Sequence, residues 1–163
     1  MNDQDQDQKW SWTIGNPWYL ERLIYNYCYG EEDNVEEWEK DRYKNIDMEY
    51  FTFLLTHTDV NHQKEINGFT SLTLVCMVRD YNRPTKPYDL IKFLLDSGAD
   101  PNLKTKRGQT ALFGALGSGV KSHIQLILES GGDPYAVDED GDDYKEYTTN
   151  QELRELVESY MKN

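Results

Sequence analysis

Two short sequences that each occur twice in the second half of the chain decide the fold. Residues 107–112 read RGQTAL and match NGFTSL at 67–72. Residues 93–102 read FLLDSGADPN and match ILESGGDP at 127–134, with a one-residue shift of the leucines. Self-similarity at a fixed period is the signature of a repeat architecture, so the pattern predicts a stack of similar units.

The interval between copies supports the repeat and locates an insertion. It is 33 residues from Gly108 to Gly141 but 40 from Gly68 to Gly108, so the earlier repeat carries seven additional residues. We place this insertion at 79–87, where two prolines and mixed charges are typical of a loop. A weaker copy, FLLTHTDVN, lies upstream at 53–61.

At these residues the chain resembles the ankyrin-repeat family, over roughly residues 46–145. The family unit is a 33-residue turn and two antiparallel helices that begins Gly-x-Thr-Pro-Leu-His and ends Gly-Ala-Asp-Val-Asn. The 25 residues from Gly108 to Asp133 are the distance that this pattern requires. The family's histidine is replaced by Thr73 in one copy and by Phe113 in the next, so we expect reduced local stability there.

The resemblance implies an all-α ankyrin-repeat solenoid of about three to four helix pairs, with irregular capping helices at both ends. Each helix pair has an apolar face that only stacking against its neighbours buries. We expect one domain over 10–163, preceded by a disordered acidic and Gln-rich tail at 1–9. The domain divides into an irregular opening repeat (16–66), a repeat with the insertion (67–105), a repeat (106–138) and a C-terminal cap (139–163).

The capping helices have their own sequence signals. Asn16 and Pro17 are typical of a helix start, and the apolar residues that follow at 3- and 4-residue steps predict a helix over 18–29. A second helix is expected through Tyr50 to Leu55. Near the C-terminus, apolar residues on one face and charged residues on the other predict a closing helix over about 152–160.

Charge and cysteine content narrow the partners and the compartment. The chain has 17 Lys and Arg against 30 Asp and Glu, a net charge of −13, which excludes nucleic acid and an anionic membrane as main partners and favours a basic protein surface. No apolar run is long enough to span a membrane. Cys28 and Cys76 lie far apart without disulfide spacing, so we expect a reducing, cytoplasmic location. A monomer is the favoured state.

Catalytic and metal-binding patterns are missing from the sequence. His57, His62 and His123 have no catalytic or ligand spacing, and no nucleophile elbow or paired-cysteine motif occurs. Residues 114–122 approach a phosphate-binding loop, but Val120 separates the second glycine of that motif from the lysine, and we assign the glycines to a turn between helices. We therefore expect no catalytic residues, no metal, no cofactor and no enzymatic activity.

In the family, partners are held by the turn tips and by the inner face of the first helix of each pair. Phe69 and Met77 are expected anchors, because large apolar side chains at such positions often carry interfaces; the alternative is that the 79–87 insertion covers them. The same positions of the repeats in this sequence are occupied by the following residues, which we expect to bind the partner: Ile66, Asn67, Phe69, Met77, Val78, Lys106, Arg107, Gln109, Gly117, Ser118, Glu139, Asp140 and Asp142.

The sequence leaves three functions open, all of them binding functions. The first is a non-enzymatic interaction module for a basic protein, acting as a stoichiometric inhibitor such as a toxin immunity protein. The second is a viral or bacterial ankyrin protein directed at a host. The third is an acidic mimic of nucleic acid, in which the carboxylates of 31–39 and 138–143 imitate a row of phosphates.

Overall fold

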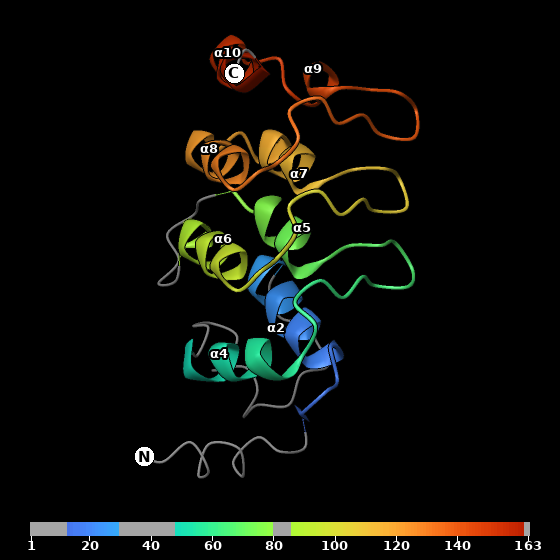
Figure 1. Cartoon of the computed structure of the whole chain (residues 1–163), viewed down its shortest axis with the longest axis vertical. Helices are drawn as coiled ribbons and strands as arrows, with labels where there is room; N and C mark the ends of the chain where they lie inside the picture. The colour runs from blue at the N-terminus through green and yellow to red at the C-terminus, as the bar shows by residue number, and fades with distance from the viewer. Residues whose placement is uncertain (1–12, 30–47, 80–85, 162–163) are drawn as a thin grey trace.

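The computed structural model describes residues 13–29, 48–79 and 86–161, and over these residues all regular structure is helical. The helices form four successive pairs that lie as layers in one stack (Figure 1). The expected all-α repeat solenoid is thus confirmed. The pairs are α2 (Trp18–Tyr29) with α4 (Met48–His57), α5 (Ser71–Cys76) with α6 (Pro87–Asp96), α7 (Ala111–Ser118) with α8 (Lys121–Glu129), and α9 (Tyr144–Tyr147) with α10 (Gln151–Met161).

The pairs stack in two rows. Helices α2, α5, α7 and α9 contact one another in sequence as an inner row, and α6, α8 and α10 do so in an outer row. The rings of Phe51 in α4 and Phe93 in α6 lie 5.7 Å apart and extend the outer row to the first pair. One apolar core runs through the stack, as expected where each layer buries the face of the next.

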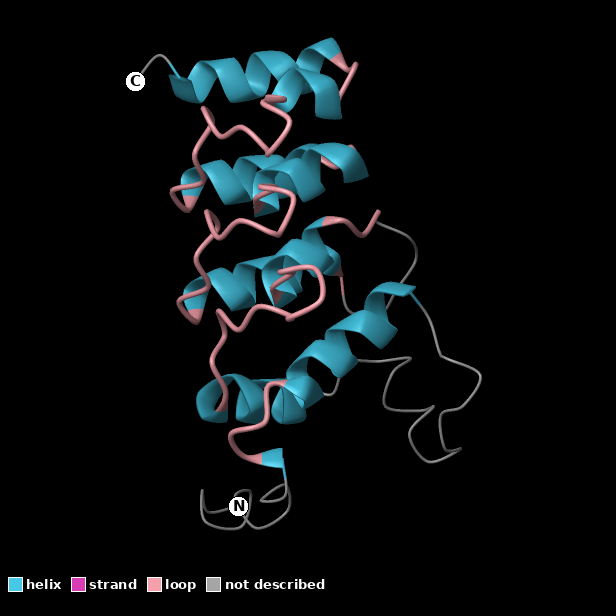
Figure 2. Ribbon diagram, turned by 90° about the vertical axis from the view of Figure 1, so that its right-hand side faces the viewer, coloured by secondary structure: helices cyan, strands magenta, loops and turns pink. Residues whose placement is uncertain are grey.

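Three long turns project from the same side of the stack (Figures 1 and 2). We call 58–70 the first finger, 97–110 the second and 130–143 the third. Neighbouring fingers are joined through their backbones: the N–H of Lys106 donates to the oxygen of Asn67 at 2.9 Å, and that of Glu139 to the oxygen of Arg107 at 3.0 Å. The fingers therefore form one continuous sheet-like edge rather than three independent loops.

Two glycines allow the fingers to approach this closely. Gly68 and Gly108 have φ of +72° and +75°, a backbone conformation that L side chains rarely adopt. A Cβ on Gly68 would lie 2.8 Å from the nitrogen of Lys106, and one on Gly108 would lie 2.7 Å from that of Glu139. The glycine that begins each copy is thus required by both the turn and the next finger.

A ladder of asparagine amides ties each repeat to the next. The Nδ2 of Asn61 donates to the oxygen of Gly98 at 3.1 Å, and its Oδ1 accepts from the nitrogen of Asp100 at 2.8 Å. Asn102 makes the same two bonds one repeat later, at 2.9 and 2.8 Å. At the corresponding place in the last repeat stands Tyr135, whose hydroxyl donates to a backbone oxygen at the end of α10. The ladder thus ends on the closing helix.

The inner helices α5 and α7 begin differently. Thr70 caps α5: its hydroxyl accepts from the nitrogen of Thr73 at 3.1 Å, and the Thr73 hydroxyl accepts from the nitrogen of Thr70 at 2.8 Å. Thr73 thus supplies turn hydrogen bonds at the place where the family has histidine. Thr110 has the same extended backbone before α7, but its buried hydroxyl has no hydrogen-bond partner. There Phe113 packs on Tyr147, with ring centroids 4.4 Å apart.

Several sequence predictions need correction or fall outside the described residues. Gly114 and Gly117 are not turn residues but lie within α7, because the turn is made by Gly119 with φ +74°. Pro87, which we had placed in the insertion, is buried as the first residue of α6. The tail at 1–9, the acidic stretch at 31–39 and residues 80–85 of the insertion lie outside the described residues.

Candidate functional site

The tips of the three fingers differ in chemistry. The first is apolar, the second basic and the third acidic. No ion pair joins the basic tip to the acidic tip among the described residues, although the two fingers share a backbone hydrogen bond. Their charges are therefore available to a partner. The exposed residues that define the tips are Ile66, which is 80% exposed, then Lys106 and Arg107, then Glu139, Asp140 and Asp142.

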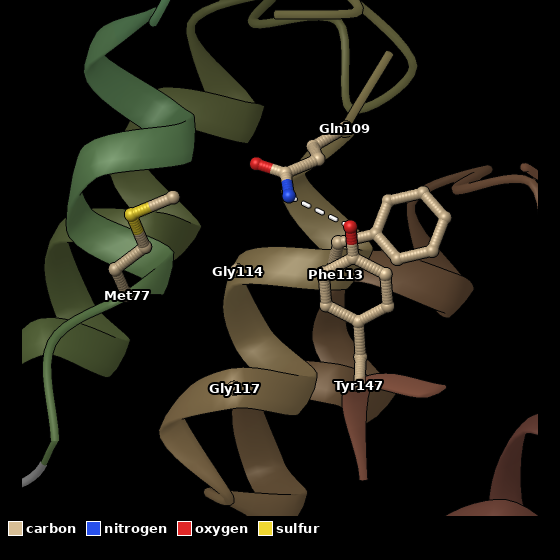
Figure 3. Close-up of a pocket in the computed structure, with 6 residues that line it drawn as sticks. All are labelled: Met77, Gln109, Phe113, Gly114, Gly117 and Tyr147. Carbon is tan, nitrogen blue, oxygen red and sulfur yellow. Dashed lines mark hydrogen bonds between the residues drawn. The ribbon is translucent and has the colours of Figure 1, made fainter. Parts of the chain in front are cut away.

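A pocket of about 280 Å³ opens between the inner helices (Figure 3). Its size depends on Gly114 and Gly117 of α7, which place no side chain in it. Gly114 also lets α7 approach α5, because a Cβ there would lie 3.2 Å from the Cγ of Met77. A Cβ on Gly117 would have no neighbour within 4 Å. The lining residues are Met77, Gln109, Phe113, Gly114, Gly117 and Tyr147.

One end of this pocket is polar and fixed by a chain of hydrogen bonds. The Nε2 of Gln109 donates to the hydroxyl of Tyr147 at 2.7 Å, and that hydroxyl donates to Oδ2 of Asp138 at 2.6 Å. The other oxygen of Asp138 accepts from the nitrogens of Asp140 and Asp142, both at 2.9 Å. The second finger is thereby joined at the pocket to the third finger and to α9, which directly follows the third finger.

These hydrogen bonds stabilise a negative charge on Asp138 beside the pocket. The hydrogen bond from Tyr147, with further bonds from backbone N–H groups of the third finger, lowers the pKa of the Asp138 carboxyl below its usual value. Burial, together with the hydrogen bond to Asp138, raises the pKa of Tyr147. Asp138 is thus ionised and Tyr147 protonated at neutral pH, so Tyr147 is fixed as the donor to Asp138.

The sequence-derived binding residues separate into three groups in space. Met77, Gln109 and Gly117 come together in the pocket. The six tip residues lie along the fingers. Asn67 joins the first finger to the second, because its backbone oxygen accepts a hydrogen bond from the nitrogen of Lys106. Phe69 is half-buried and packs against the core, and whether the insertion covers it lies outside the described residues.

Val78 and Ser118 do not present their side chains to a partner. Val78 is only 6% exposed, because α5 ends at Cys76 and a tight turn, in which the nitrogen of Val78 donates to the oxygen of Val75, carries its side chain into the core. Ser118 is 8% exposed, and its hydroxyl donates to the oxygen of Ala115 in its own helix. Both assignments are corrected.

Sequence reasoning missed Phe113 and Tyr147 as pocket residues. Phe113 stands where the family has histidine, which is a departure visible in the sequence. Tyr147 lies 33 residues after Gly114, so the repeat frame places it one layer above that glycine. A large ring one repeat after a glycine on the inner face is the signal that would have indicated a pocket.

The described residues hold neither a metal-binding cluster nor a membrane-spanning helix. They contain no group of three or more His, Cys, Asp or Glu side chains arranged to hold a metal ion. Among their helices, none has both the length and the apolar composition required to cross a bilayer.

Comparison with known proteins identifies the repeat. The ankyrin repeat family model matches residues 67–106. Ankyrin repeat and SOCS box protein 6 of Homo sapiens is 38% identical over 97 residues, which cover 55% of this chain and 22% of that protein. An ankyrin repeat protein of Acanthamoeba polyphaga mimivirus is 38% identical over 60 residues (37% of this chain, 10% of that protein), and one of fowlpox virus is 39% identical over 57 residues (35% and 22%).

The matches therefore span at most about a fifth of these relatives' lengths. The relatives share the repeat with this chain, but the similarity does not extend over their whole length. The fold agrees with the match: paired helices stack in two rows, joined fingers project to one side, and asparagine amides bridge successive repeats. The chain therefore contains an ankyrin repeat and is similar in sequence and fold to ankyrin-repeat proteins, and such repeats are protein–protein interaction modules.

Proposed function

We propose that this chain binds a protein with a basic surface through the side formed by α5, α7, α9 and the fingers, and that it inhibits that protein by occupying its surface at 1:1 stoichiometry. A toxin immunity protein is one protein of this kind. The observation that carries the proposal is an apolar pocket on the inner face directly joined to an acidic finger. An apolar centre with a charged rim is the usual anatomy of a protein interface.

Charge supports the choice of a basic partner. Five of the six residues from 138 to 143 are Asp or Glu, and the chain as a whole has a net charge of −13. Such a field accelerates encounter with a positively charged surface and repels an acidic one. The basic tip at Lys106 and Arg107 lies next to the acidic one, so the preferred partner also has an acidic group beside its basic patch.

Inhibition by occupancy follows from the kind of site. Ankyrin repeats are in general non-enzymatic, and the groups gathered here, a pocket, a hydrogen-bonded tyrosine and charged tips, recognise a surface without a nucleophile or a base aimed at a reacting atom. A bound repeat array covers what it touches. We therefore expect the activity of the partner, rather than any activity of this chain, to be the quantity that binding changes.

Two other functions have an observation in their favour. The carboxylates at 138–143 form a dense acidic row on an exposed finger, which favours mimicry of nucleic acid. Relatives in mimivirus and fowlpox virus favour a protein directed at a host. The first alternative predicts a binding site confined to the acidic finger, and the second predicts a partner from a different organism.

The test is affinity capture by the immobilised chain from a lysate of the source organism, washed at low and high salt. One variant, Gly117→Leu, places a side chain in the pocket at a position where a Cβ meets no atom within 4 Å. A second, Glu139→Gln with Asp140→Asn, removes two of the three carboxylates of the acidic tip. The matched control removes two carboxylates from the outer helices, Asp89→Asn with Glu155→Gln. We expect both test variants to lose a basic protein that the control retains.

Each other outcome assigns a different function. Capture that survives Gly117→Leu but is lost on neutralising the tip, or in high salt, favours mimicry of a polyanion. Capture that is equal in all variants refutes binding by this face. A captured protein whose activity is unchanged by saturating amounts of this chain refutes inhibition but leaves binding intact.

A further inference from the structure

We infer that the pocket lined by Met77, Phe113 and Tyr147 is a subsite for one arginine side chain of the partner protein. This inference deepens the proposed function and rests on it, because it names the group that enters the inner face.

The dimensions fit a single long side chain. Pockets for drug-sized ligands are typically about 300–1,000 Å³. At about 280 Å³ this pocket lies below that range, and it is open to the inner face rather than enclosed. A side chain that projects from a bound surface can therefore enter from outside, without any opening of the stack.

The walls suit a planar cation on an apolar stem. The rings of Phe113 and Tyr147 lie 4.4 Å apart at an angle of 46° and form one side, and the flexible thioether of Met77 forms the opposite side (Figure 3). Aromatic faces attract guanidinium groups, and the three-carbon stem of arginine packs on apolar surface while its head reaches polar groups. The two helical glycines supply the space between these walls.

The polar end of the pocket offers an acceptor. Because the Nε2 of Gln109 is engaged by the Tyr147 hydroxyl, the amide is held with its Oε1 on the side that faces Met77 (Figure 3). No hydrogen bond to this oxygen occurs among the described residues. The hydroxyl of Tyr147 is itself turned toward Asp138, so it accepts rather than donates at the pocket. A ligand that ends in N–H donors satisfies both oxygens.

The charges on the surrounding elements favour a cation on balance. The third finger carries six carboxylates, of which Asp138 reaches the pocket through Tyr147. The second finger opposes these with Lys104, Lys106 and Arg107, but the ammonium of Lys104 is already bonded to a backbone oxygen of the third finger at 3.2 Å. Arg79 follows α5, and α7 has no charged residue. The local sum is negative.

The subsite can be tested without the partner, on the full chain labelled with ¹³C at its methionine methyl groups. The probe is N-acetyl-arginine methylamide, compared with the neutral citrulline analogue and the apolar norleucine analogue. We expect the arginine probe to shift the Met77 signal with a Kd on the order of 1 mM. The citrulline and norleucine probes should bind about three- to tenfold more weakly, because they lack the charge.

Two variants separate the subsite from general effects. Gly117→Leu should abolish the shift of Met77 without lowering the thermal unfolding midpoint, since leucine favours a helix and a Cβ at this position meets no atom within 4 Å. Gln109→Leu removes one acceptor but none of the surrounding charges, so the preference for arginine over norleucine should decrease while binding persists. Both variants are checked for folding by circular dichroism.

Three outcomes would overturn the inference. Norleucine binding as well as arginine would assign the pocket to an apolar side chain. Shifts at Met48 or Met161 with none at Met77 would place arginine elsewhere. A change of the Met77 signal caused by Tyr81→Ala with Arg83→Ala, without probe, would identify the chain's own insertion as the occupant. None of these results affects capture of a protein by the fingers, so this inference fails separately from the proposed function.

Discussion

The two threonines that precede α5 and α7 should respond in opposite ways to the same substitution. Thr70 and Thr110 occupy equivalent positions, both are buried and both have extended backbones. The hydroxyl of Thr70 accepts a bond from the nitrogen of Thr73, whereas that of Thr110 has no partner. Valine keeps the shape of threonine and removes only the hydroxyl, so each substitution isolates that group.

The magnitudes follow from these contacts. Loss of a threonine cap costs about 1 kcal/mol, up to about 2 kcal/mol. Because Thr73 keeps its own bonds to the backbone of residue 70, we expect Thr70→Val to destabilise the chain by about 1 kcal/mol, or a fall in Tm of about 2–4 °C for a chain of this size. Burial of an unpaired hydroxyl costs about 1–3 kcal/mol in protein data. We therefore expect Thr110→Val to be neutral or to stabilise by up to about 1 kcal/mol.

Urea denaturation followed by helical circular dichroism measures both values on the same protein. The comparison uses the midpoint at constant slope, since a change in slope would report a change in the surface exposed on unfolding. A loss of stability in Thr110→Val equal to that in Thr70→Val would refute the reasoning. It would mean that the Thr110 hydroxyl finds a partner in solution and that the two turns are equivalent.

Three further substitutions test the fingers and the pocket. Gly108→Ala should destabilise by about 2–4 kcal/mol in urea denaturation, because it combines a positive φ with a clash, whereas Gly119→Ala, with the same φ and no neighbour, should cost about 1 kcal/mol. Asn102→Ala should lower the free energy of unfolding by about 1–3 kcal/mol, because it removes two hydrogen bonds that bridge the repeats. Amide hydrogen exchange should then become faster in the third finger. An increase confined to the first finger would contradict the ladder. Tyr147→Phe should raise the pKa of Asp138, as measured by NMR titration of its carboxyl carbon. In the wild type, the lowered pKa of Asp138 contributes stability that is lost as the pH falls through that pKa, and the variant should lack the part that comes from Tyr147. An unchanged titration would contradict the hydrogen bond.

The sequence predicted the parts of the fold that depend on backbone geometry. Only glycine fits a turn position that has a positive φ and contacts the neighbouring finger, so Gly68 and Gly108 recur at the same place in successive copies of the sequence. The asparagine of the ladder also recurs in the sequence, because its short amide donates to one backbone group and accepts from another. The positions of the fingers follow from these residues, and the exposed tip residues with them.

The pocket was not predictable in the same way, because it depends on side chains that differ between repeats. Gln109 and Tyr147 are 38 residues apart and meet only because the layers stack. Val78 was misplaced because α5, with six residues, is shorter than α7, with eight, and the turn after Cys76 redirects the next side chains. In the sequence alone, residues that depart from the repeat pattern indicate only that the repeats are degenerate. Their contacts become visible only in the structure, where neighbouring layers stack.

The inner face of α7 is where this chain gives up local stability, and the losses coincide with the pocket. Two glycines within an eight-residue helix cost about 0.5–1 kcal/mol each relative to alanine. Gly114 has a packing reason, since it lets α5 approach, but Gly117 has none: a Cβ there would meet no atom within 4 Å. The unpaired hydroxyl of Thr110 lies at the start of the same helix, whereas the equivalent Thr70 is fully bonded. Sequences normally agree with their fold at every level, and they break local rules mainly at functional sites. The one physical consequence of Gly117 is an open pocket beside an ionised Asp138, so the energetic cost in α7, as well as the shape of the pocket, favours recognition at this place.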